Sequence, residues 1–206
     1  MIIINFKTYK QGKQVLELAK TIEKYNKKAI IAVQPTDIKN LAEKTNLQIY
    51  SQHTDGYEKG RNTGFIIPEA IKNAGAKGTL LNHSEHKITL NQIKQTIGLC
   101  KKFNLKVICC VNDLKEANKI KKLYPYGIAF EPSNLIATGK SITEYKELEL
   151  KRFINLLMGS KIIPICGAGI SSKKDIIKAK ELGCKGILIS SAITKGKKEK
   201  IKEMLI

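Results

Sequence analysis

Short apolar runs recur along the chain, separated by longer stretches in which apolar residues return with a helical period. The runs are rich in isoleucine, valine, leucine and cysteine. Most are continuous, as expected of strands that are buried on both faces of a parallel sheet. The pattern predicts eight strands, which begin near Ile2, Ala29, Leu47, Gly78, Lys106, Gly127, Lys161 and Gly186.

Helices are predicted between the strands, because apolar residues there recur every three or four positions. The residues predicted to share a buried helix face are Val15, Ala19 and Ile22, then Ile93, Ile97 and Cys100, and lastly Ile201, Met204 and Leu205. The expected start and stop signals are Pro35-Thr36 before one helix, a capping box at Ser172-x-x-Asp175, and C-terminal glycines at Gly75 and Gly183.

Strands that alternate with helices in a chain of 206 residues predict one α/β domain, a closed (β/α)8 barrel that spans residues 1–206. A doubly wound open sheet is the alternative. Closure is favoured because Gly75-x-Lys77-Gly78 is echoed by Gly183-x-Lys185-Gly186, half a barrel further on. Such barrels usually take ~250 residues, so we expect compact helices, with the second and fifth brief or one of them reduced to a loop.

The chain has 37 lysines and arginines against 18 acidic residues, a formal net charge of +19. Such a charge attracts phosphorylated metabolites and nucleic acid alike. The lysines, however, are spread over nearly every expected helix, without an arginine cluster or interleaved aromatic residues that could stack on bases. We therefore interpret them as a solvated surface and expect no nucleic-acid partner.

The cellular setting follows from what the chain lacks. No apolar run approaches the roughly 18 residues of a membrane-spanning helix, so we expect no membrane contact. The first residues turn polar at once, which predicts no secretory signal and a cytoplasmic protein. The five cysteines show no paired spacing and are expected to be reduced and buried, with Cys109 and Cys110 on opposite faces of one strand.

Chemistry in such barrels lies on the loops after the strands, so the polar residues there are the candidates. Asn5 and Lys7 leave the first strand toward the same side. Asn82-His83-Ser84-Glu85-His86 follows the fourth strand and has several interpretations: surface histidines, a metal cluster, a glycosylation sequon, or an imidazole that acts as acid or electrophile. No further histidine and cysteine set completes four ligands, so we expect no metal.

Three later strand ends add to this set. Glu131 leaves the sixth strand just before a proline, in a position for general-base chemistry, although a lone glutamate there is more often a salt-bridge partner. The small, mostly uncharged residues 133–139 are typical of a lid. Gly167-Ala168-Gly169 and Ser190-Ser191 follow the last two strands, where barrels of this type hold phosphate on backbone N–H groups. Together these groups predict one anion-lined active site.

With these residues the sequence resembles the triosephosphate isomerase family of TIM barrels, and specifically its shorter archaeal branch. The matching stretches run in order through nearly the whole chain: Ile4-Asn5-Phe6-Lys7-Thr8-Tyr9, Ser51-Gln52-His53, Gly78-Thr79-Leu80-Leu81-Asn82-His83-Ser84-Glu85, Glu131-Pro132, Leu135-Ile136-Ala137-Thr138-Gly139, Cys166-Gly167-Ala168-Gly169-Ile170, and residues 186–194.

The resemblance implies an isomerase of glycolysis and gluconeogenesis that interconverts D-glyceraldehyde 3-phosphate and dihydroxyacetone phosphate through an enediolate, without metal or organic cofactor. The family is itself a standard example of a glutamate base beside a neutral histidine. By resemblance Glu131 is the base, His83 the electrophile, and Lys7 the fixed positive charge, which Asn5 supports. Ser84 and Glu85 would orient these groups.

The resemblance also implies a lid at residues 132–140 and a set of substrate- and phosphate-binding residues: Phe6, Ile136, Ala137, Gly167, Gly169, Ser190 and Ser191. The chain departs from the family where Ala137 replaces a lid glycine and where Ser190-Ser191 replaces two glycines of other branches. Family members are oligomers, so we expect a homo-oligomer, with a tetramer favoured and a dimer possible. Thr63, in the third strand-to-helix loop, would lie near the neighbouring subunit.

Two other functions stay open from the residues alone. Another phosphosugar barrel enzyme, such as an aldolase, needs a Schiff-base lysine, for which Lys7 is the only candidate among the strand ends. A basic barrel without catalytic activity that binds RNA is the third possibility, and its affinity would fall steeply with salt.

Overall fold

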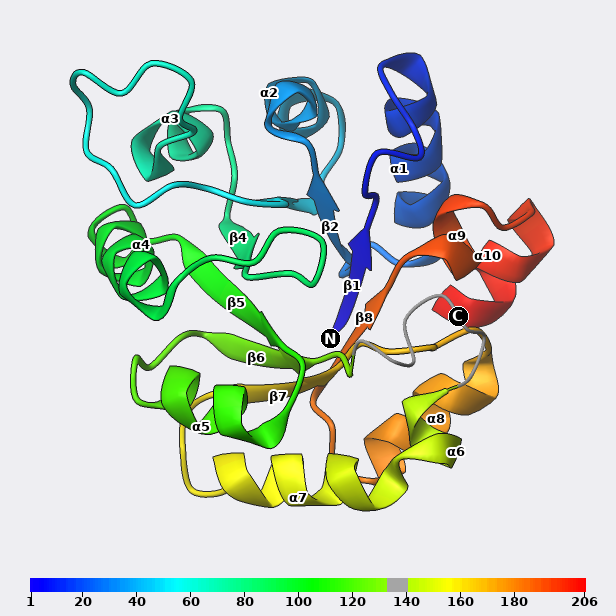
Figure 1. Ribbon diagram of the computed structural model, residues 1–206. Helices are drawn as coiled ribbons and strands as arrows, with labels where there is room; N and C mark the ends of the chain where they lie inside the picture. Colours follow the sequence, from blue (N-terminus) through cyan, green and yellow to red (C-terminus); the bar gives the residue numbers. More distant parts are fainter. Residues whose placement is uncertain (133–140) are drawn as a thin grey trace.

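The computed structural model describes residues 1–132 and 141–206. Its strands form a closed barrel in the order β1 to β8, with parallel neighbours throughout. Figure 1 shows the helices arranged around the outside of the strands. The predicted closed barrel is thus confirmed, and the open sheet is excluded. Ile136, Ala137 and most of the expected lid lie outside the described residues.

Each predicted apolar run contains one strand. The strands are β1 Ile2–Asn5, β2 Ile30–Val33, β3 Gln48–Ser51, β4 Gly78–Leu81, β5 Lys106–Val111, β6 Gly127–Phe130, β7 Ile163–Cys166 and β8 Gly186–Ile189. The barrel closes where β1 pairs with β8, with Ile3 opposite Leu188. Because all strands run in the same direction, their carboxyl ends gather at one mouth of the barrel.

The helices of the described residues are α1 Lys13–Tyr25, α2 Pro35–Lys44, α3 Pro68–Asn73, α4 Leu90–Lys102, α5 Leu114–Lys121, α6 Ile142–Tyr145, α7 Glu147–Leu157, α8 Lys173–Glu181, α9 Ser191–Thr194 and α10 Lys198–Leu205. The predicted capping box of Ser172 and Asp175 begins α8. Gly75 and Gly183 have φ angles of 105° and 106°, in the left-handed region that glycine adopts without strain.

The expectation about helix length needs one correction. α5 is brief, with 8 residues, but α2 has 10 residues, and the helix between β3 and β4, α3, is shorter than both, with 6. After β3, residues 52–67 form a long loop before α3 begins. Sequence periodicity alone does not show how a connection divides its length between loop and helix.

The interior of the barrel is filled by large side chains that lie opposite glycines. Tyr50 on β3 is fully buried, and a Cβ atom at Gly78 would lie 2.5 Å from its ring. Ile165 on β7 approaches Gly127 and Gly186 in the same way, at 2.8 Å from the position of each missing Cβ. The glycines that begin β4, β6 and β8 therefore make room for the packed interior.

A second apolar layer lies between the strands and the helices. Val15, Ile97 and Met204 from three predicted helix faces are all buried in it. The neighbours Cys109 and Cys110 on β5 divide between the two layers, Cys109 facing the helices and Cys110 the interior, as strand alternation predicts. All five cysteines are in the described residues, buried and unpaired.

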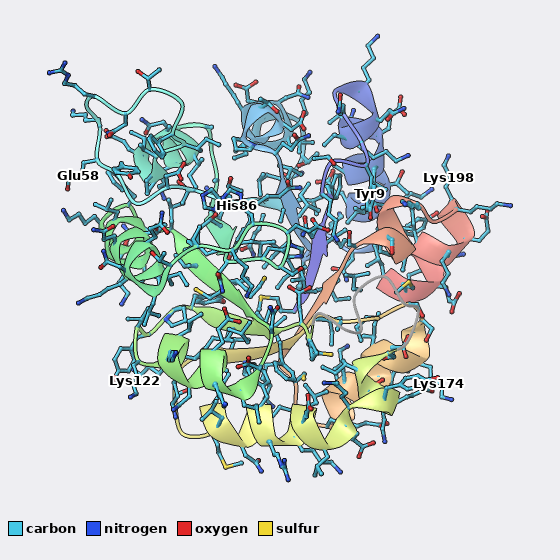
Figure 2. The ribbon with its side chains drawn as sticks, viewed as in Figure 1. Tyr9, Glu58, His86, Lys122, Lys174 and Lys198 are labelled. Carbon is cyan, nitrogen blue, oxygen red and sulfur yellow. The ribbon has the colours of Figure 1, made fainter. Side chains whose placement is uncertain are left out.

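The outer surface is rich in lysine. Lys122, Lys174 and Lys198 extend outward from three helical segments at the edge of the molecule (Figure 2). Within residues 1–132 and 141–206, no helix has both the length and the apolar character that crossing a membrane requires.

Candidate active site

The predicted catalytic residues converge on one cavity at the carboxyl ends of the strands. The cavity has a volume of about 120 Å³, which fits a small ligand, since drug-sized ligands need roughly 300–1,000 Å³. The sequence-predicted residues that line it are Asn5, Lys7, His83, Glu131, Gly167, Gly169, Ser190 and Ser191. Residues that the sequence did not single out also line it: Tyr9, Ile170, Ser171, Leu188 and Ile189.

Lys7 is held in an uncommon backbone conformation just after β1. Its φ angle is 47°, in the left-handed region that residues with a Cβ seldom adopt. The Asn5 Oδ1 atom accepts a hydrogen bond from the Lys7 backbone N–H at 3.0 Å, which closes a local turn. Gln52, on the loop after β3, donates its side-chain N–H to the Lys7 carbonyl at 2.8 Å. Two side chains thus hold Lys7 in place.

Phe6 lies elsewhere than the sequence predicted. Strand alternation turns its side chain away from Asn5 and Lys7, and it is buried in the layer between strands and helices. It is absent from the described lining of the cavity. Its side chain therefore packs in the core and does not face a ligand there.

His83 enters the cavity from the loop after β4, and a neighbouring backbone N–H group determines the tautomer of its neutral ring. The Glu85 backbone N–H donates to His83 Nδ1 at 3.2 Å. A ring nitrogen that accepts a hydrogen bond carries no proton, so the neutral ring has its proton on Nε2, and this tautomer is inferred from the hydrogen bond. Nε2 lies 3.8 Å from Glu131 Oε2, so its N–H group faces the cavity as a donor.

Glu85 also determines where the charge of Lys7 lies. The Lys7 Nζ atom is 2.6 Å from Glu85 Oε1, and the Lys7 side chain is mostly buried. The Glu85 side chain is exposed, but the buried stem of Lys7 and this short contact together orient the long side chain. The ammonium group is therefore held at the edge of the cavity, close to the imidazole of His83.

Glu131 is the most unusual group in the cavity. Its side chain is buried at the end of β6, and Oε2 has no hydrogen-bond partner among the described atoms. Burial raises the pKa of this carboxyl, while the neighbouring His83, the Cys110 thiol and Lys7 act in the opposite direction. A desolvated carboxylate is a stronger base than one in water, as proton abstraction requires.

Gly167 makes the position of Glu131 possible. A Cβ at residue 167 would lie 2.5 Å from Glu131 Cγ and 2.9 Å from Cδ, closer than real side-chain contacts allow. The glycine after β7 therefore allows the carboxylate to lie against the backbone.

Backbone N–H groups form the other end of the cavity. Gly169 has a φ angle of 69°, and α9 begins at Ser191 directly after β8. Within residues 1–132 and 141–206, the N–H groups of Gly169 and Ser191 donate to no acceptor. Ser190 is held by its hydroxyl, which donates to the Asn5 carbonyl at 2.8 Å. Free N–H groups after the last two strands suit a phosphate.

Two supporting residues had only weak sequence signals. Gln52 follows directly on β3 and belongs to the matching stretch Ser51-Gln52-His53, but neither feature assigned it a role. Tyr9 lines the cavity two residues after Lys7, and the Lys195 ammonium lies 4.2 Å from the centre of its ring. Their roles depend on partners distant in the chain, which a single sequence does not reveal.

A metal centre has no support in the described part of the chain, where no cluster of three or more histidines, cysteines or carboxylates is placed to hold an ion. His53 and His86 stack at 4.2 Å instead, and Asp55 lies 3.2 Å from His53 Nε2.

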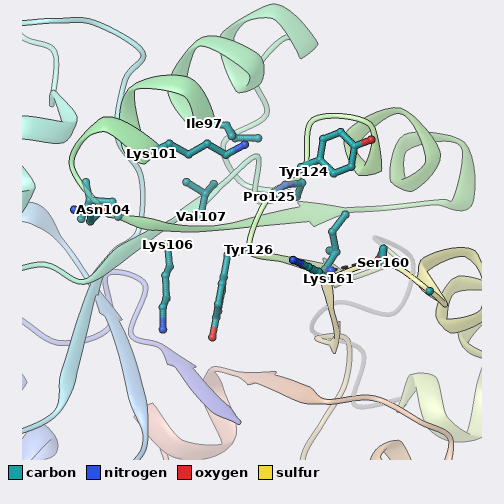
Figure 3. Close-up of a pocket in the computed structure, with 13 residues that line it drawn as sticks. Ile97, Lys101, Asn104, Lys106, Val107, Tyr124, Pro125, Tyr126, Ser160 and Lys161 are labelled. Carbon is teal, nitrogen blue, oxygen red and sulfur yellow. Dashed lines mark hydrogen bonds between the residues drawn. The ribbon is translucent and has the colours of Figure 1, made fainter.

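A larger cavity, of about 820 Å³, lies at the opposite end of the barrel around the starts of β5, β6 and β7 (Figure 3). Its floor is apolar, with Leu105, Val107 and Ile162, and Lys101 and Lys161 are at its edge. Its described lining includes no carboxylate, histidine or cysteine. The candidate site is therefore identified by its chemical groups and not by the size of its cavity.

Comparison with known proteins gives a consistent result. A family model described as triosephosphate isomerase matches residues 1–205. The triosephosphate isomerase of Methanocaldococcus jannaschii is 35% identical over 215 aligned residues, which cover 100% of this chain and 98% of that protein. The triosephosphate isomerase of Saccharolobus solfataricus is 38% identical over 214 residues, with 100% and 94% covered.

Proposed function

The chain belongs to the triosephosphate isomerase family, and from this premise we propose that it interconverts D-glyceraldehyde 3-phosphate and dihydroxyacetone phosphate with Glu131 as the base. The supporting observation is the buried carboxylate of Glu131, 3.8 Å from the imidazole of His83. Both line a cavity that also includes Gly169 and Ser191, whose N–H groups donate to no acceptor within residues 1–132 and 141–206. Other phosphosugar chemistry and a barrel without catalytic activity are not favoured.

Glu131 removes the proton from the carbon next to the carbonyl group. The C–H electrons form the carbon–carbon double bond of an enediolate, and the carbonyl π electrons move to the oxygen. A proton moves from the neighbouring hydroxyl to the enediolate oxygen, and the same carboxyl then returns its proton to the adjacent carbon, which yields the other triose phosphate. Burial favours this step because it destabilises the charged carboxylate, and Oε2, which has no partner among the described atoms, is available to the substrate proton.

His83 and Lys7 stabilise the charge that develops on the substrate oxygens. The His83 Nε2–H group donates to the oxygen that becomes negative, and it can move a proton between the two oxygens. The Lys7 ammonium adds a positive charge of fixed position, since Glu85 pairs with the ammonium and Gln52 holds the Lys7 backbone. Preorganised donors of this kind lower the barrier without rearranging during the reaction.

The phosphate group is held at Gly169, Ser190 and Ser191 through backbone N–H groups. Binding of the phosphate positions the three-carbon chain so that its reacting carbon lies next to the Glu131 carboxylate. The net charge of +19 brings anionic substrates toward the molecule. Ile136 and Ala137, expected to add N–H groups, belong to the segment outside the described residues.

We further propose a cytoplasmic homo-oligomer, with a tetramer favoured and a dimer possible. The support is the long loop after β3, which contains Thr63 and projects at one side of the barrel (Figure 1). A monomer of 23.0 kDa by light scattering at micromolar concentration would contradict the oligomer.

The activity is tested with purified protein and glyceraldehyde 3-phosphate, by coupling dihydroxyacetone phosphate formation to the oxidation of NADH. We expect turnover by the wild-type protein and a loss of several orders of magnitude in Glu131→Gln, with folding intact. Glu149→Gln, which changes a carboxylate on the outer surface of α7, is the matched control. Near-normal turnover in Glu131→Gln would refute the assignment.

A further inference from the structure

The loop between β4 and α4 presents His83 and Glu85, and its first residue is conformationally restrained. Asn82 has a φ angle of 58°, a left-handed conformation that asparagine tolerates better than most residues. Both polar atoms of its side chain are hydrogen-bonded. Nδ2 donates to the Cys110 carbonyl at 2.9 Å and to Glu116 Oε1 at 2.7 Å. Its Oδ1 accepts from the Ile88 backbone N–H at 3.2 Å.

Glu116, in the first turn of α5, joins both ends of this loop. One end is Asn82, described above. At the other end, Lys87 Nζ lies 2.9 Å and 3.0 Å from the two Glu116 oxygens. Glu116 Oε2 also accepts from the Asn112 backbone N–H at 2.7 Å, which anchors the carboxylate to the end of β5. Glu116 is absent from the lining of the cavity, so it has no described contact with a bound substrate.

A simpler account makes Glu116 only a helix cap, since carboxylates in a first turn often bind backbone N–H groups of the preceding residues. That account explains the contact with Asn112. It does not explain why the other oxygen is bound to Asn82, 34 residues earlier in the chain, or why Lys87 bridges both oxygens. Hydrogen bonds to a charged group are also stronger than neutral ones.

We propose that Glu116 is a positioning residue that acts through Asn82 to place the His83 imidazole for the reaction. The proposal rests on the proposed isomerase function. Without the carboxylate, Asn82 loses an acceptor and Lys87 loses its partner, so the loop is free to shift. A displacement of about 1 Å in a catalytic group can reduce turnover about 100-fold.

The expected kinetic signature is specific. The phosphate-binding groups lie after β7 and β8, on the other side of the cavity, so Glu116 has no route to them through the contacts described above. Loss of Glu116 should therefore lower kcat by about tenfold or more and leave KM nearly unchanged. The inhibition constant of inorganic phosphate, used as a competitive probe, should also stay within about twofold of the wild-type value.

The test uses Glu116→Ala and Glu116→Gln, with Glu149→Ala as the surface control and Lys87→Met to remove the ion pair alone. Asn82→Gly keeps the left-handed conformation accessible and removes the side chain. If Glu116 acts through Asn82, the double variant Glu116→Ala/Asn82→Gly loses no more kcat than Asn82→Gly alone. Lys87→Met should be milder than Glu116→Ala.

Two results would overturn the proposal: a folded Glu116→Ala or Glu116→Gln protein with kcat within about twofold of wild type, or fully additive losses in the double variant. Wild-type protein without isomerase activity would instead refute the proposed function. In that case the backbone amide and imidazole NMR signals of His83 still decide the structural claim. They should shift in Glu116→Gln and not in Glu149→Ala, and unshifted signals would contradict the positioning role.

Discussion

Replacing Gly167 with alanine should displace the Glu131 side chain, although no titratable residue is itself substituted. The φ angle of Gly167 lies outside the left-handed region, so alanine adds no backbone strain. Its Cβ, however, would lie 2.5 Å from Glu131 Cγ, 2.9 Å from Cδ and 3.1 Å from Oε1. Carbon atoms in contact are normally about 3.5–4.0 Å apart, so the carboxylate must retreat by about 1 Å.

A shift of this size in a general base is expected to cost about 100-fold in turnover. That factor corresponds to about 2.7 kcal/mol in the activation barrier. KM should change less than kcat, because the N–H groups of Ser190 and Ser191, which we propose bind the phosphate, remain in place. The measurement is the steady-state rate with glyceraldehyde 3-phosphate in the NADH-coupled assay, together with thermal unfolding to confirm that the variant is folded.

Gly98→Ala is the matched control. A Cβ at Gly98, on α4, would have no atom within 4 Å. This variant should keep wild-type turnover and gain up to about 1 kcal/mol in stability, since alanine favours helix over glycine. A folded Gly167→Ala protein with kcat within about threefold of wild type would refute the argument that Gly167 places the base.

Three further predictions concern stability. Burial raises the pKa of Glu131, so ionisation of this carboxyl destabilises the folded state as pH rises above about 4.5. Glu131→Gln should therefore unfold at a higher temperature than wild type at pH 7. The difference in unfolding temperature should vanish near pH 4. Desolvation lowers the pKa of His53, so the folded state is stabilised fully when His53 is neutral, above about pH 6.5, and this stabilisation is lost as pH falls. His53→Gln should therefore make the urea midpoint decline less steeply below that pH. An unchanged slope would contradict this. Ser172→Ala removes the side-chain acceptor of the capping box of α8 and should lower the free energy of unfolding by about 1 kcal/mol, or the Tm by about 2–4 °C in calorimetry.

The described candidate site residues could be found in the sequence because strand ends are local features. The apolar run that ends at Phe130 indicates where β6 stops, and Glu131 is the next residue. The same reasoning located Asn5, His83 and Gly167. Parallel strands then bring these separate positions to one mouth of the barrel, so the site followed once the alternating elements had indicated the fold.

Phe6 and the helix lengths show the limits of this reasoning. The resemblance suggested Phe6 as a binding residue, but side-chain alternation along the strand places it in the core. The division of a connection into loop and helix was also not predictable, because the residues after β3 lack a clear helical period and α3 covers only Pro68–Asn73.

What the sequence alone determined was therefore the barrel, the buried faces and the chemical groups at the strand ends, because each depends on periodicity within about ten residues. Only the tertiary structure decided how those groups are held. Gln52 braces Lys7, the Glu85 N–H group selects the proton position on His83, and Gly167 admits the carboxylate of Glu131. The first and last of these contacts join residues that are distant along the chain, and all three depend on packing in three dimensions, which leaves no periodic trace in the sequence.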